Sequence, residues 1–467
     1  MPQWFAQINH VAPRRVGPRR LVRAVTVTGM LALAAAVFLA PGIAGHLPGV
    51  RAASQQYDEL WRQDSAASFG AWTMNGVANA TGAGPRLSPA RKSTLTCAPG
   101  DIDGGAANFD TGTGLCAGTD PYPAGGYLNG LNYYTGASFW YGTILSPVHT
   151  TGQPINHVIV SWNATTPAGT WIETHVRVLR QSAWTHWYIL PIWASDFSTI
   201  HRHSVNGQAD TDGGVATDTF FTKAGQVATA YQLAVTLFTT APKASPTIRL
   251  IAGIASYDAT QYQSFPADPT VWGTDLPVPQ RSQMLPQYQG LGFGGGGEVW
   301  CSPTSTSMVM AYWSNVLGQT SLNQTVPLAA EGTYDYAYGG TGNWPYNTAY
   351  AASYGLTGFV TRMSSMSQVE QWIKVGVPIV ISVAFNNGQL PGEPVKNSPG
   401  HLLVVRGFTA TGDVITNDPA ASTDAGVRIV YQRADLENVW QFGSNGTAYV
   451  MYPQGWPVPT VDAGGSW

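Results

Sequence analysis

A cysteine, a histidine and an Asn-Asp pair occur in that order in the second half of this 467-residue chain. Cys301 directly precedes Ser302-Pro303 and an apolar repeat at helical spacing. It therefore lies at a helix N-terminus, where unpaired N–H groups and the helix dipole stabilise a thiolate. A thiolate nucleophile also needs a base, and His401, at the start of an apolar strand, is the candidate. This arrangement predicts a nucleophilic thiol paired with an imidazole.

A third side chain must orient the imidazole, and two neighbouring residues compete for that role. Asn417 and Asp418 end the next apolar strand after His401. Adjacent strand residues point to opposite faces, so only one of the two can face His401. A strict two-residue turn does not place Asp418 directly opposite His401. We therefore expect a bulge, a twist or a wider loop between these strands.

The elements around these residues are predicted to be two helices and several strands. The first helix has one buried face, formed by Val309, Tyr312, Trp313 and Val316 at i, i+3, i+4 and i+7. Gly318 ends that helix. Ser367 with Glu370 forms a capping box, which predicts a second helix that runs to Gly376. Apolar runs predict strands at 378–384, 401–405 and 414–417. This order of elements indicates an α+β fold.

Four motifs of the second half are those of a known family. They are Val278–Gln283 (VPQRSQ), Trp300–Ser305 (WCSPTS), Gly400–Val405 (GHLLVV) and Asn417–Ala420 (NDPA). In these motifs and their order, the chain resembles the bacteriocin-processing (double-glycine) peptidase-like family of papain-like cysteine peptidases. The resemblance covers roughly residues 276–455 and is closest to freestanding secreted members. It implies a papain-like cysteine peptidase domain.

The resemblance also implies the roles of individual residues. Cys301 would be the nucleophile, His401 the general base and Asp418 the orienting group. Gln283 would donate its amide N–H to the oxyanion of the tetrahedral intermediate. Other glutamines of the same segment compete with Gln283 for that role, namely Gln280, Gln287 and Gln289. The implied reaction is thiolate attack on a peptide carbonyl, formation of an acyl-enzyme, and hydrolysis.

Two departures from the family pattern keep alternatives open. The family commonly has Gly after the cysteine, whereas this chain has Ser302, whose Cβ crowds the approach to the thiol. One alternative is therefore a catalytically inactive secreted binding module. The sequence also lacks the membrane and ATP-binding segments of transporters, so leader-peptide processing is not implied. A second alternative is an amidase or acyltransferase that acts on cell-wall peptide through the same Cys-His pair.

Residues 1–53 are predicted to be a secretion signal. They contain six of the 23 Lys and Arg residues and no acid, and an uncharged apolar run spans Ala24–Ala40. Val50-Arg51-Ala52 offers a cleavage site for export. The alternative is a retained membrane anchor, although the run is short for a span. We expect a secreted or cell-envelope protein without a membrane segment after signal removal. In an oxidising compartment Cys97 and Cys116 would form a disulfide, and Cys301 would remain as the unpaired cysteine.

The first half of the chain is predicted to be an all-β domain. Charged residues make up only 10%, with 53 Gly and 32 Pro. Short apolar strands are expected at 157–162, 171–178, 187–192, 230–238 and 247–254. They predict an antiparallel sandwich, jelly-roll-like, over 54–270, followed by a Pro-rich junction at 271–280 and the peptidase domain at 281–467.

The expected partners follow from charge and aromatic content. Beyond residue 53 acids outnumber bases, so nucleic-acid binding is not expected. The family resemblance implies a peptide or protein substrate, with cell-wall peptide as one class. Exposed aromatics on the first domain would contact carbohydrate, or else they form its core. His201 and His203 lack a third ligand, so we expect no metal and no cofactor. The aromatic segment 334–346 is either a wall of the substrate cleft or a packed loop.

Overall fold

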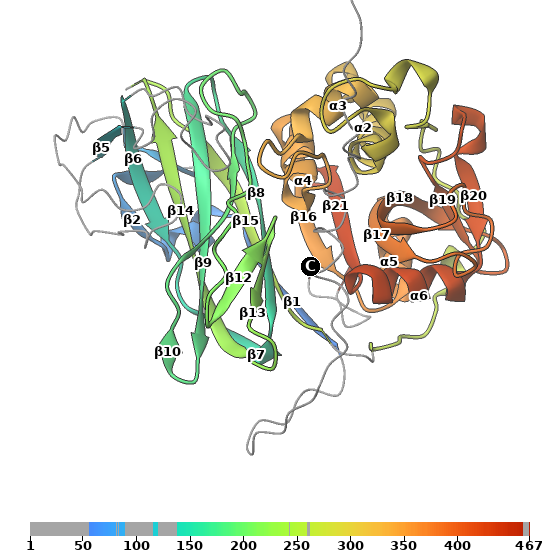
Figure 1. Cartoon of the computed structure of the whole chain (residues 1–467), viewed down its shortest axis with the longest axis horizontal. Helices are drawn as coiled ribbons and strands as arrows, with labels where there is room; N and C mark the ends of the chain where they lie inside the picture. The colour runs from blue at the N-terminus through green and yellow to red at the C-terminus, as the bar shows by residue number, and fades with distance from the viewer. Residues whose placement is uncertain are drawn as a thin grey trace, which may run out of the picture. The chain divides into compact units, whose positions relative to one another are not determined.

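The computed structural model describes residues 56–80, 82, 84–88, 115–119, 138–241, 243–258, 262–460 and 467 (Figure 1). No helix in these ranges is long and apolar enough to cross a membrane. The predicted signal 1–53 and Cys97 lie outside the described residues. Cys116 lies in a described strand, but its side chain is not among the described parts. Its pairing with Cys97 therefore stays a prediction.

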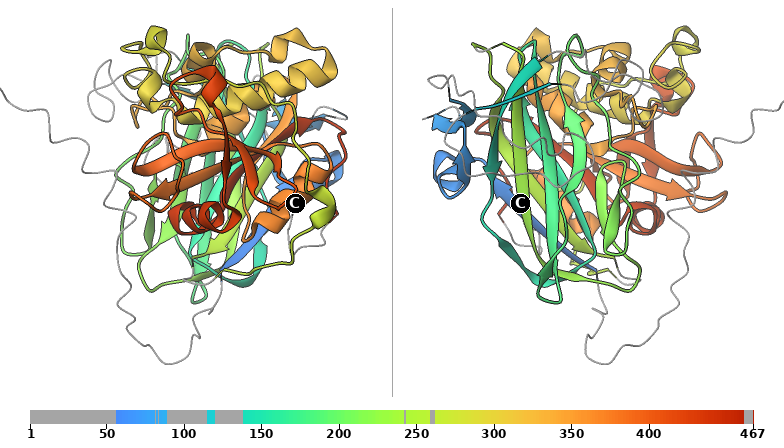
Figure 2. Two further views of the ribbon diagram at one scale, coloured as in Figure 1. Left: turned by 90° about the vertical axis from the view of Figure 1, so that its right-hand side faces the viewer. Right: turned by 60° about the vertical axis from the view of Figure 1, so that its left-hand side comes forward.

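Two antiparallel sheets make up the described part of residues 57–257, here called the two-sheet region (Figure 2). The first sheet contains β1 (Tyr57–Gln63), β3 (Val77–Ala80), β4 (Gly84–Leu87), β8 (His157–Thr165), β12 (Gly213–Ala216), β13 (Thr219–Thr222) and β15 (Thr247–Tyr257). The second contains β2 (Thr73–Asn75), β5 (Cys116–Thr119), β6 (Ser138–Leu145), β7 (His149–Ile155), β9 (Thr170–Arg180), β10 (Ala183–Trp184), β11 (Tyr188–Trp193) and β14 (Ala228–Thr239). A short helix, α1 (Ala66–Gly70), follows β1. All five strands expected from the sequence are present.

Aromatic side chains of this region form part of its interior. Trp171 on β9 stacks on Phe238 of β14 with ring centroids 4.9 Å apart, and Phe139 of β6 packs edge-on against both rings. All three side chains are buried. The strands β9 and β14 are therefore covered on both faces, and residues of both orientations are buried along most of their length.

One antiparallel sheet and five helices form the described part of residues 276–453, here called the C-terminal region. The sheet order is β16 (Leu356–Arg362), β21 (Thr447–Pro453), β17 (Ile379–Phe385), β18 (Ser398–Phe408), β19 (Val414–Asn417) and β20 (Arg428–Tyr431). The helices are α2 (Cys301–Leu317), α3 (Val326–Thr333), α4 (Trp344–Ser353), α5 (Met366–Lys374) and α6 (Arg433–Ser444). The sequence predicted α2 and α5 but not the other three.

The first predicted helix, α2, begins at Cys301 and ends at Gly318, whose φ of 67° is left-handed. The expected single buried face is wrong. All residues from Ser302 to Ser314 are buried, whereas Val316 is 43% exposed. The helix contacts β18, α3 and α4, so neighbours surround it. Its small polar residues Thr304 and Ser305 lie inside for that reason.

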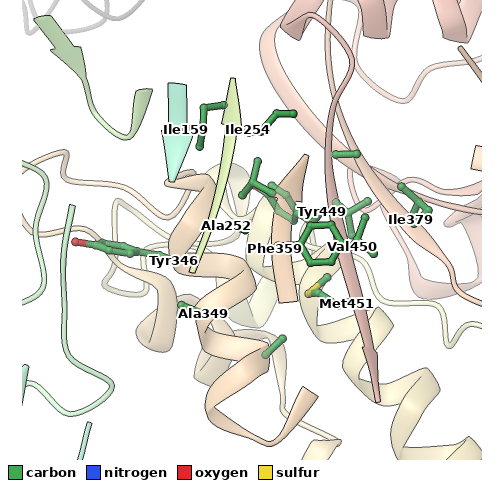
Figure 3. Close-up of a cluster of buried hydrophobic side chains, with 14 of the residues drawn as sticks. Ile159, Ala252, Ile254, Tyr346, Ala349, Phe359, Ile379, Tyr449, Val450 and Met451 are labelled. Carbon is green, nitrogen blue, oxygen red and sulfur yellow. The ribbon is translucent and has the colours of Figure 1, made fainter. Parts of the chain in front are cut away.

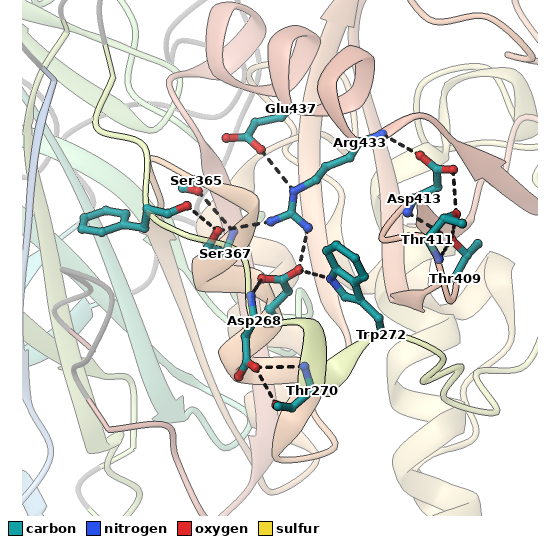
Figure 4. A network of polar contacts seen from close by, with 12 residues as sticks. Asp268, Thr270, Trp272, Ser365, Ser367, Thr409, Thr411, Asp413, Arg433 and Glu437 are labelled. Atoms are coloured by element: carbon teal, nitrogen blue, oxygen red, sulfur yellow. Dashed lines mark hydrogen bonds and ion pairs between the residues drawn. The ribbon is translucent and has the colours of Figure 1, made fainter.

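The capping box predicted for the second helix is also wrong. Ser365, not Ser367, caps α5, and its side chain accepts from the backbone N–H of Ser367. Glu370 is fully buried and serves tertiary contacts instead. Its carboxylate accepts from Trp272 Nε1 at 2.9 Å and from Arg433 Nη1 at 2.5 Å (Figure 4). A buried carboxylate needs such partners, and this one joins the junction before the C-terminal region to α5 and α6.

The two regions share one hydrophobic core. Figure 3 shows Ile159 of β8 and Ile254 of β15 in the same cluster as Phe359 of β16 and Val450 of β21 (Figure 3). Tyr346 of α4 packs against further aromatic rings of the two-sheet region, those of Trp162 and Trp193. Asn163 of β8 donates to the carbonyl of Gly358 and accepts from its N–H, which continues the contact into β16. The regions are therefore packed together without a solvated gap between these elements.

The segment after β15 is bound along the C-terminal sheet. The N–H of Gly273 donates to the carbonyl of Phe408, and the N–H of Phe408 donates to that of Thr274. Leu276 N–H donates to the carbonyl of Arg406. These bonds occupy the end of β18 that β17 leaves unpaired. The predicted Pro-rich junction thus adds a short strand-like edge to the sheet.

Candidate active site

The fold places Cys301 at the first position of α2, as the sequence predicted. The first helical hydrogen bond is that of Thr304 N–H to the carbonyl of Trp300, and Pro303 has no N–H. The N–H groups of Cys301 and Ser302 therefore stand outside the ladder of the helix. The thiol is partly exposed and is the one free cysteine in the described part of the chain. A partly exposed thiol at a helix N-terminus suits a nucleophile.

His401 lies on β18, opposite Val383 of β17, and its side chain is only 6% exposed. Its Nε2 is 2.7 Å from Oδ1 of Asp418, which leaves Nδ1 as the ring nitrogen available to Cys301, whose side chain interacts electrostatically with the imidazole. Burial disfavours the charged ring. The Asp418 carboxylate and the Cys301 sulfur nevertheless raise the pKa of His401 from 6.5 to about 10. The imidazole is thus held between a thiol and a carboxylate.

Asp418 is buried and has a partner for each oxygen. Oδ1 also accepts from the N–H of Ala420 at 3.0 Å, and Oδ2 accepts from the Tyr431 hydroxyl at 2.8 Å. Burial would raise the pKa of this carboxyl, but His401 and these donors lower it below 3.8. The carboxylate therefore stays ionised beside the imidazole. Tyr431, at the end of β20, is a site residue that no sequence pattern indicated.

A β-bulge decides which of the two competing residues faces His401. Near the turn, Phe408 pairs with Val414 and Gly407 with Ile415. Past Arg406, the register shifts by one residue, so that Val404 pairs with Asn417. Asp418 then falls on the face of Leu403 and His401, because faces alternate along a strand. An unshifted register would have turned Asn417 to that face instead. The expected bulge is thus present at Arg406.

Asn417 has a different use on the other face of the strand. Its Nδ2 donates to the carbonyls of Val278 and Pro279 at 3.2 and 3.1 Å. Its Oδ1 accepts from Arg406 Nη1, which also donates to the carbonyl of Val278. These bonds fix the segment that leads to Gln283. The two neighbouring residues therefore serve the imidazole and the adjoining loop respectively.

Gln283 is buried against the loop that precedes Cys301. Its Nε2 donates to the carbonyls of Gly297 and Glu298 at 2.9 and 3.1 Å. Gly297 is required at this contact because a Cβ there would meet the Gln283 carbonyl oxygen at 2.0 Å. Among the competing glutamines, Gln287 and Gln289 are exposed. The Gln283 amide therefore lies beside the start of α2, and its Nε2 already donates to two backbone carbonyls.

Ser302 points away from the approach to the thiol. Its side chain is 1% exposed, and its Oγ lies 2.9 Å from the hydroxyl of Tyr449 on β21. The hydroxyl is therefore directed into the interior of the C-terminal region. The sequence led us to expect that the Ser302 side chain would crowd the approach to the Cys301 thiol. Its hydroxyl is instead turned toward Tyr449.

The described ranges contain no cluster of three or more His, Cys, Asp and Glu side chains that would hold a metal ion. His203 Nδ1 lies 2.7 Å from the carbonyl of His201, and the ring of His201 stacks on Tyr336. The two histidines of the His-x-His pattern thus have structural contacts of their own.

Two family models match this chain. Residues 59–256 match the family model described as the peptidase C39 N-terminal domain, and residues 276–447 match the peptidase C39-like family. Residues 276–447 are thus similar to the C39-like peptidase family. No curated protein matches the chain. A crystal structure of a putative C39-like peptidase from Bacillus anthracis is 16% identical, covers 38% of this chain and 96% of its own, and has a TM-score of 0.25.

Proposed function

We propose that this protein is a secreted cysteine peptidase that hydrolyses peptide bonds through Cys301, His401 and Asp418. The observation that carries the proposal is the 2.7 Å contact between His401 Nε2 and Asp418 Oδ1, with Cys301 in electrostatic interaction with the same ring. Nucleophile, base and orienting group are therefore in one chain of contacts, as acyl transfer requires. The match to the C39-like family supports the same reaction class.

The reaction proceeds in two halves. The Cys301 thiolate attacks the peptide carbonyl carbon and forms a C–S bond, while the carbonyl oxygen becomes an oxyanion. When the tetrahedral intermediate collapses, the C–N bond breaks and the amine leaves with the proton from His401 Nδ1. Water then attacks the thioester and gives its proton to His401, and the acid product leaves as the thiolate reforms. Asp418 keeps the ring oriented and stabilises its positive charge throughout.

The oxyanion would lie at the start of α2. The free N–H of Cys301 is one donor, and the Gln283 amide is proposed as the second. Gln283 donates to two backbone carbonyls in the present structure, so it must exchange one of those bonds for the oxyanion. Its position beside the loop that precedes Cys301 supports this role.

The architecture that we propose is papain-like for the C-terminal region and a β-sandwich for the two-sheet region. The central helix that starts with the nucleophile and the sheet that carries base and carboxylate support the first assignment. The core shared by the two antiparallel sheets supports the second. We further propose that residues 1–53 direct export and that the substrate is an extracellular peptide, protein or cell-wall peptide.

The test is digestion of a mixture of unfolded proteins by the mature protein under reducing conditions, with product termini mapped by mass spectrometry. Cleavage should disappear in Cys301→Ala and His401→Ala. His186→Ala is the matched control, because its Nδ1 also faces a carboxylate, that of Asp210 at 3.2 Å, in the two-sheet region. That variant should cleave like the wild type.

Several results would contradict the proposal. If the Cys301→Ala variant still cleaves, the cleavage must come from another group of the protein or from a contaminating protease. A wild type that cleaves no protein but releases amino groups from isolated cell-wall fragments would favour the amidase alternative. A wild type inactive on both, with slow alkylation of Cys301, would favour a binding module.

A further inference from the structure

The part of the aromatic segment 334–346 that precedes α4, residues 334–343, lies beside the start of α2. The Thr341 hydroxyl donates to the carbonyl of Val299, two residues before the nucleophile, at 3.1 Å. A Cβ on Gly294 would lie 3.1 Å from the carbonyl oxygen of Gly339 and 3.4 Å from Val299 Cγ2. The glycine-rich loop Phe293–Gly297, which precedes Cys301, is therefore in contact with the aromatic segment. The electrostatic interaction between the Tyr338 hydroxyl and Cys301 agrees with this placement.

One buried carboxylate shapes this segment. Asp335 is fully buried, and its Oδ1 accepts from the N–H groups of Ala337 and Tyr338 at 3.1 and 3.0 Å. Its Oδ2 accepts from Nδ2 of Asn343, the N-cap of α4, at 2.9 Å. The turn that carries Tyr338 is thus folded around this side chain.

The two-sheet region completes the support. The N–H of Ser204 donates to Oδ1 of Asp335 at 3.0 Å, and the N–H of Tyr336 donates to the carbonyl of Arg202 at 3.1 Å. Asp218, in the turn between β12 and β13, accepts from the N–H of Trp344 at 2.7 Å. These bonds hold both ends of the segment from outside the C-terminal region. The aromatic segment is therefore bound by two regions at once.

The supported segment presents apolar surface beside the nucleophile. Val299 is 49% exposed and Tyr338 is 46% exposed, both among the few large apolar side chains on the surface. The contacts of Gly294 and of the Thr341 hydroxyl join the two segments that carry these side chains. Both side chains therefore lie on segments that meet next to Cys301, and apolar surface beside a reactive group favours a ligand site.

We propose that the two-sheet region is a working part of the substrate site. Through Ser204 and Asp218 it fixes the aromatic segment, and Tyr338 with Val299 forms a wall that accepts a large apolar side chain of a peptide next to the scissile bond. This inference rests on the proposed peptidase activity. Asp218 is a positioning residue here, because it acts through the backbone of α4 and does not itself contact the peptide.

The test uses the full mature chain and matched peptides. The best cleavage site from the protein digest is made as a peptide, and its apolar residue flanking the scissile bond is replaced by Gly. We expect the wild type to prefer the apolar peptide by about tenfold in kcat/KM, from burial of one apolar side chain. Tyr338→Ala should abolish that preference. Since Tyr338 is nearly half exposed, this variant should fold even if others do not.

Asp218 is tested by a pair of variants and a control. Asp218→Ala removes the acceptor for Trp344 N–H and should raise KM for the apolar peptide roughly tenfold, with little change in kcat. Asp218→Asn keeps a carbonyl oxygen as acceptor and should recover most of that loss. Arg249→Ala removes another bond between the regions, from Arg249 Nη2 to the carbonyl of Ala352 at 2.7 Å. It should leave KM unchanged.

Each outcome bears on one of two proposals. A wild type that cleaves no peptide refutes the peptidase function and, with it, this inference. Cleavage without an apolar preference, or a preference that persists in Tyr338→Ala, refutes the wall alone. An Asp218→Ala protein with wild-type KM, or an Arg249→Ala protein with an equally raised KM, refutes the positioning role of Asp218.

Discussion

Replacing Asp418 by Asn tests the electrostatics of the site with little change in shape. The Asn Oδ1 can still accept from His401 Nε2 and from the N–H of Ala420. The Asn Nδ2 would take the place of the oxygen that accepts from Tyr431, whose hydroxyl can turn and accept in return. Asp418→Asn therefore removes a negative charge and keeps the hydrogen-bond geometry.

The magnitude follows from the difference between two kinds of hydrogen bond. A bond to a charged group contributes about 1.5–3 kcal/mol and a neutral one about 0.5–1.5 kcal/mol. The difference of about 1–1.5 kcal/mol corresponds to roughly one pKa unit. Asp418 raises the pKa of His401, which lies at about 10, so its loss lowers that pKa by at least about one unit. The imidazolium that protonates the leaving amine is then lost at lower pH.

The assay is the pH dependence of kcat/KM, combined with an NMR titration of His401. The alkaline limb of kcat/KM should move down by about one unit or more in Asp418→Asn. Asn417→Ala is the control, since Asn417 lies on the opposite strand face and should leave the limb in place. An alkaline limb that stays put or moves up in Asp418→Asn, or that moves equally in the control, would refute the reasoning.

Three further predictions concern stability and support. Tyr431→Phe removes a donor to the buried Asp418 carboxylate and should lower the free energy of unfolding by about 1–3 kcal/mol in urea titrations. Burial, with a smaller contribution from a neighbouring carboxylate, raises the pKa of Asp218 from 3.8 to about 7. The stabilisation of the folded state by protonated Asp218 is therefore complete below pH 3.8 and is lost as the pH rises through 7. In Asp218→Asn, the free energy of unfolding from urea titrations should therefore depend less on pH over that range. Residues 276–467 alone would expose the shared core and should aggregate or bind a hydrophobic dye, as gel filtration and fluorescence would show.

The sequence was sufficient to locate the helix and strands that carry the chemistry. The start of α2 at Cys301 follows from an apolar repeat behind Ser-Pro, and its end follows from Gly318. The strand at His401 is a continuous apolar run, as a strand covered on both faces requires. These patterns depend only on residues that are close together in the sequence, so they can be recognised without knowledge of the rest of the fold.

The features that the sequence did not reveal all depend on distant contacts. Glu370 has the spacing of a capping residue, yet it bonds to Trp272 and Arg433, which no local pattern links to it. The spacing of the strands alone left Asp418 and Asn417 as competitors, although the family resemblance implied Asp418. The bulge that turns Asp418 toward His401 lies where the junction segment packs. A Cβ on Gly407 would meet the Thr274 carbonyl oxygen at 1.9 Å.

The bound junction also bears on how the peptidase proposed above would survive its own activity. Connections between regions are commonly where proteases nick a chain, because an extended exposed backbone fits a protease cleft. Here the N–H groups of Gly273 and Leu276 are bonded to β18, and the carbonyls of Val278 and Pro279 are bonded to Asn417. To be cut there, the segment must first leave the sheet edge. Docking of the junction therefore protects the connection on which the proposed substrate wall depends from cleavage by neighbouring copies.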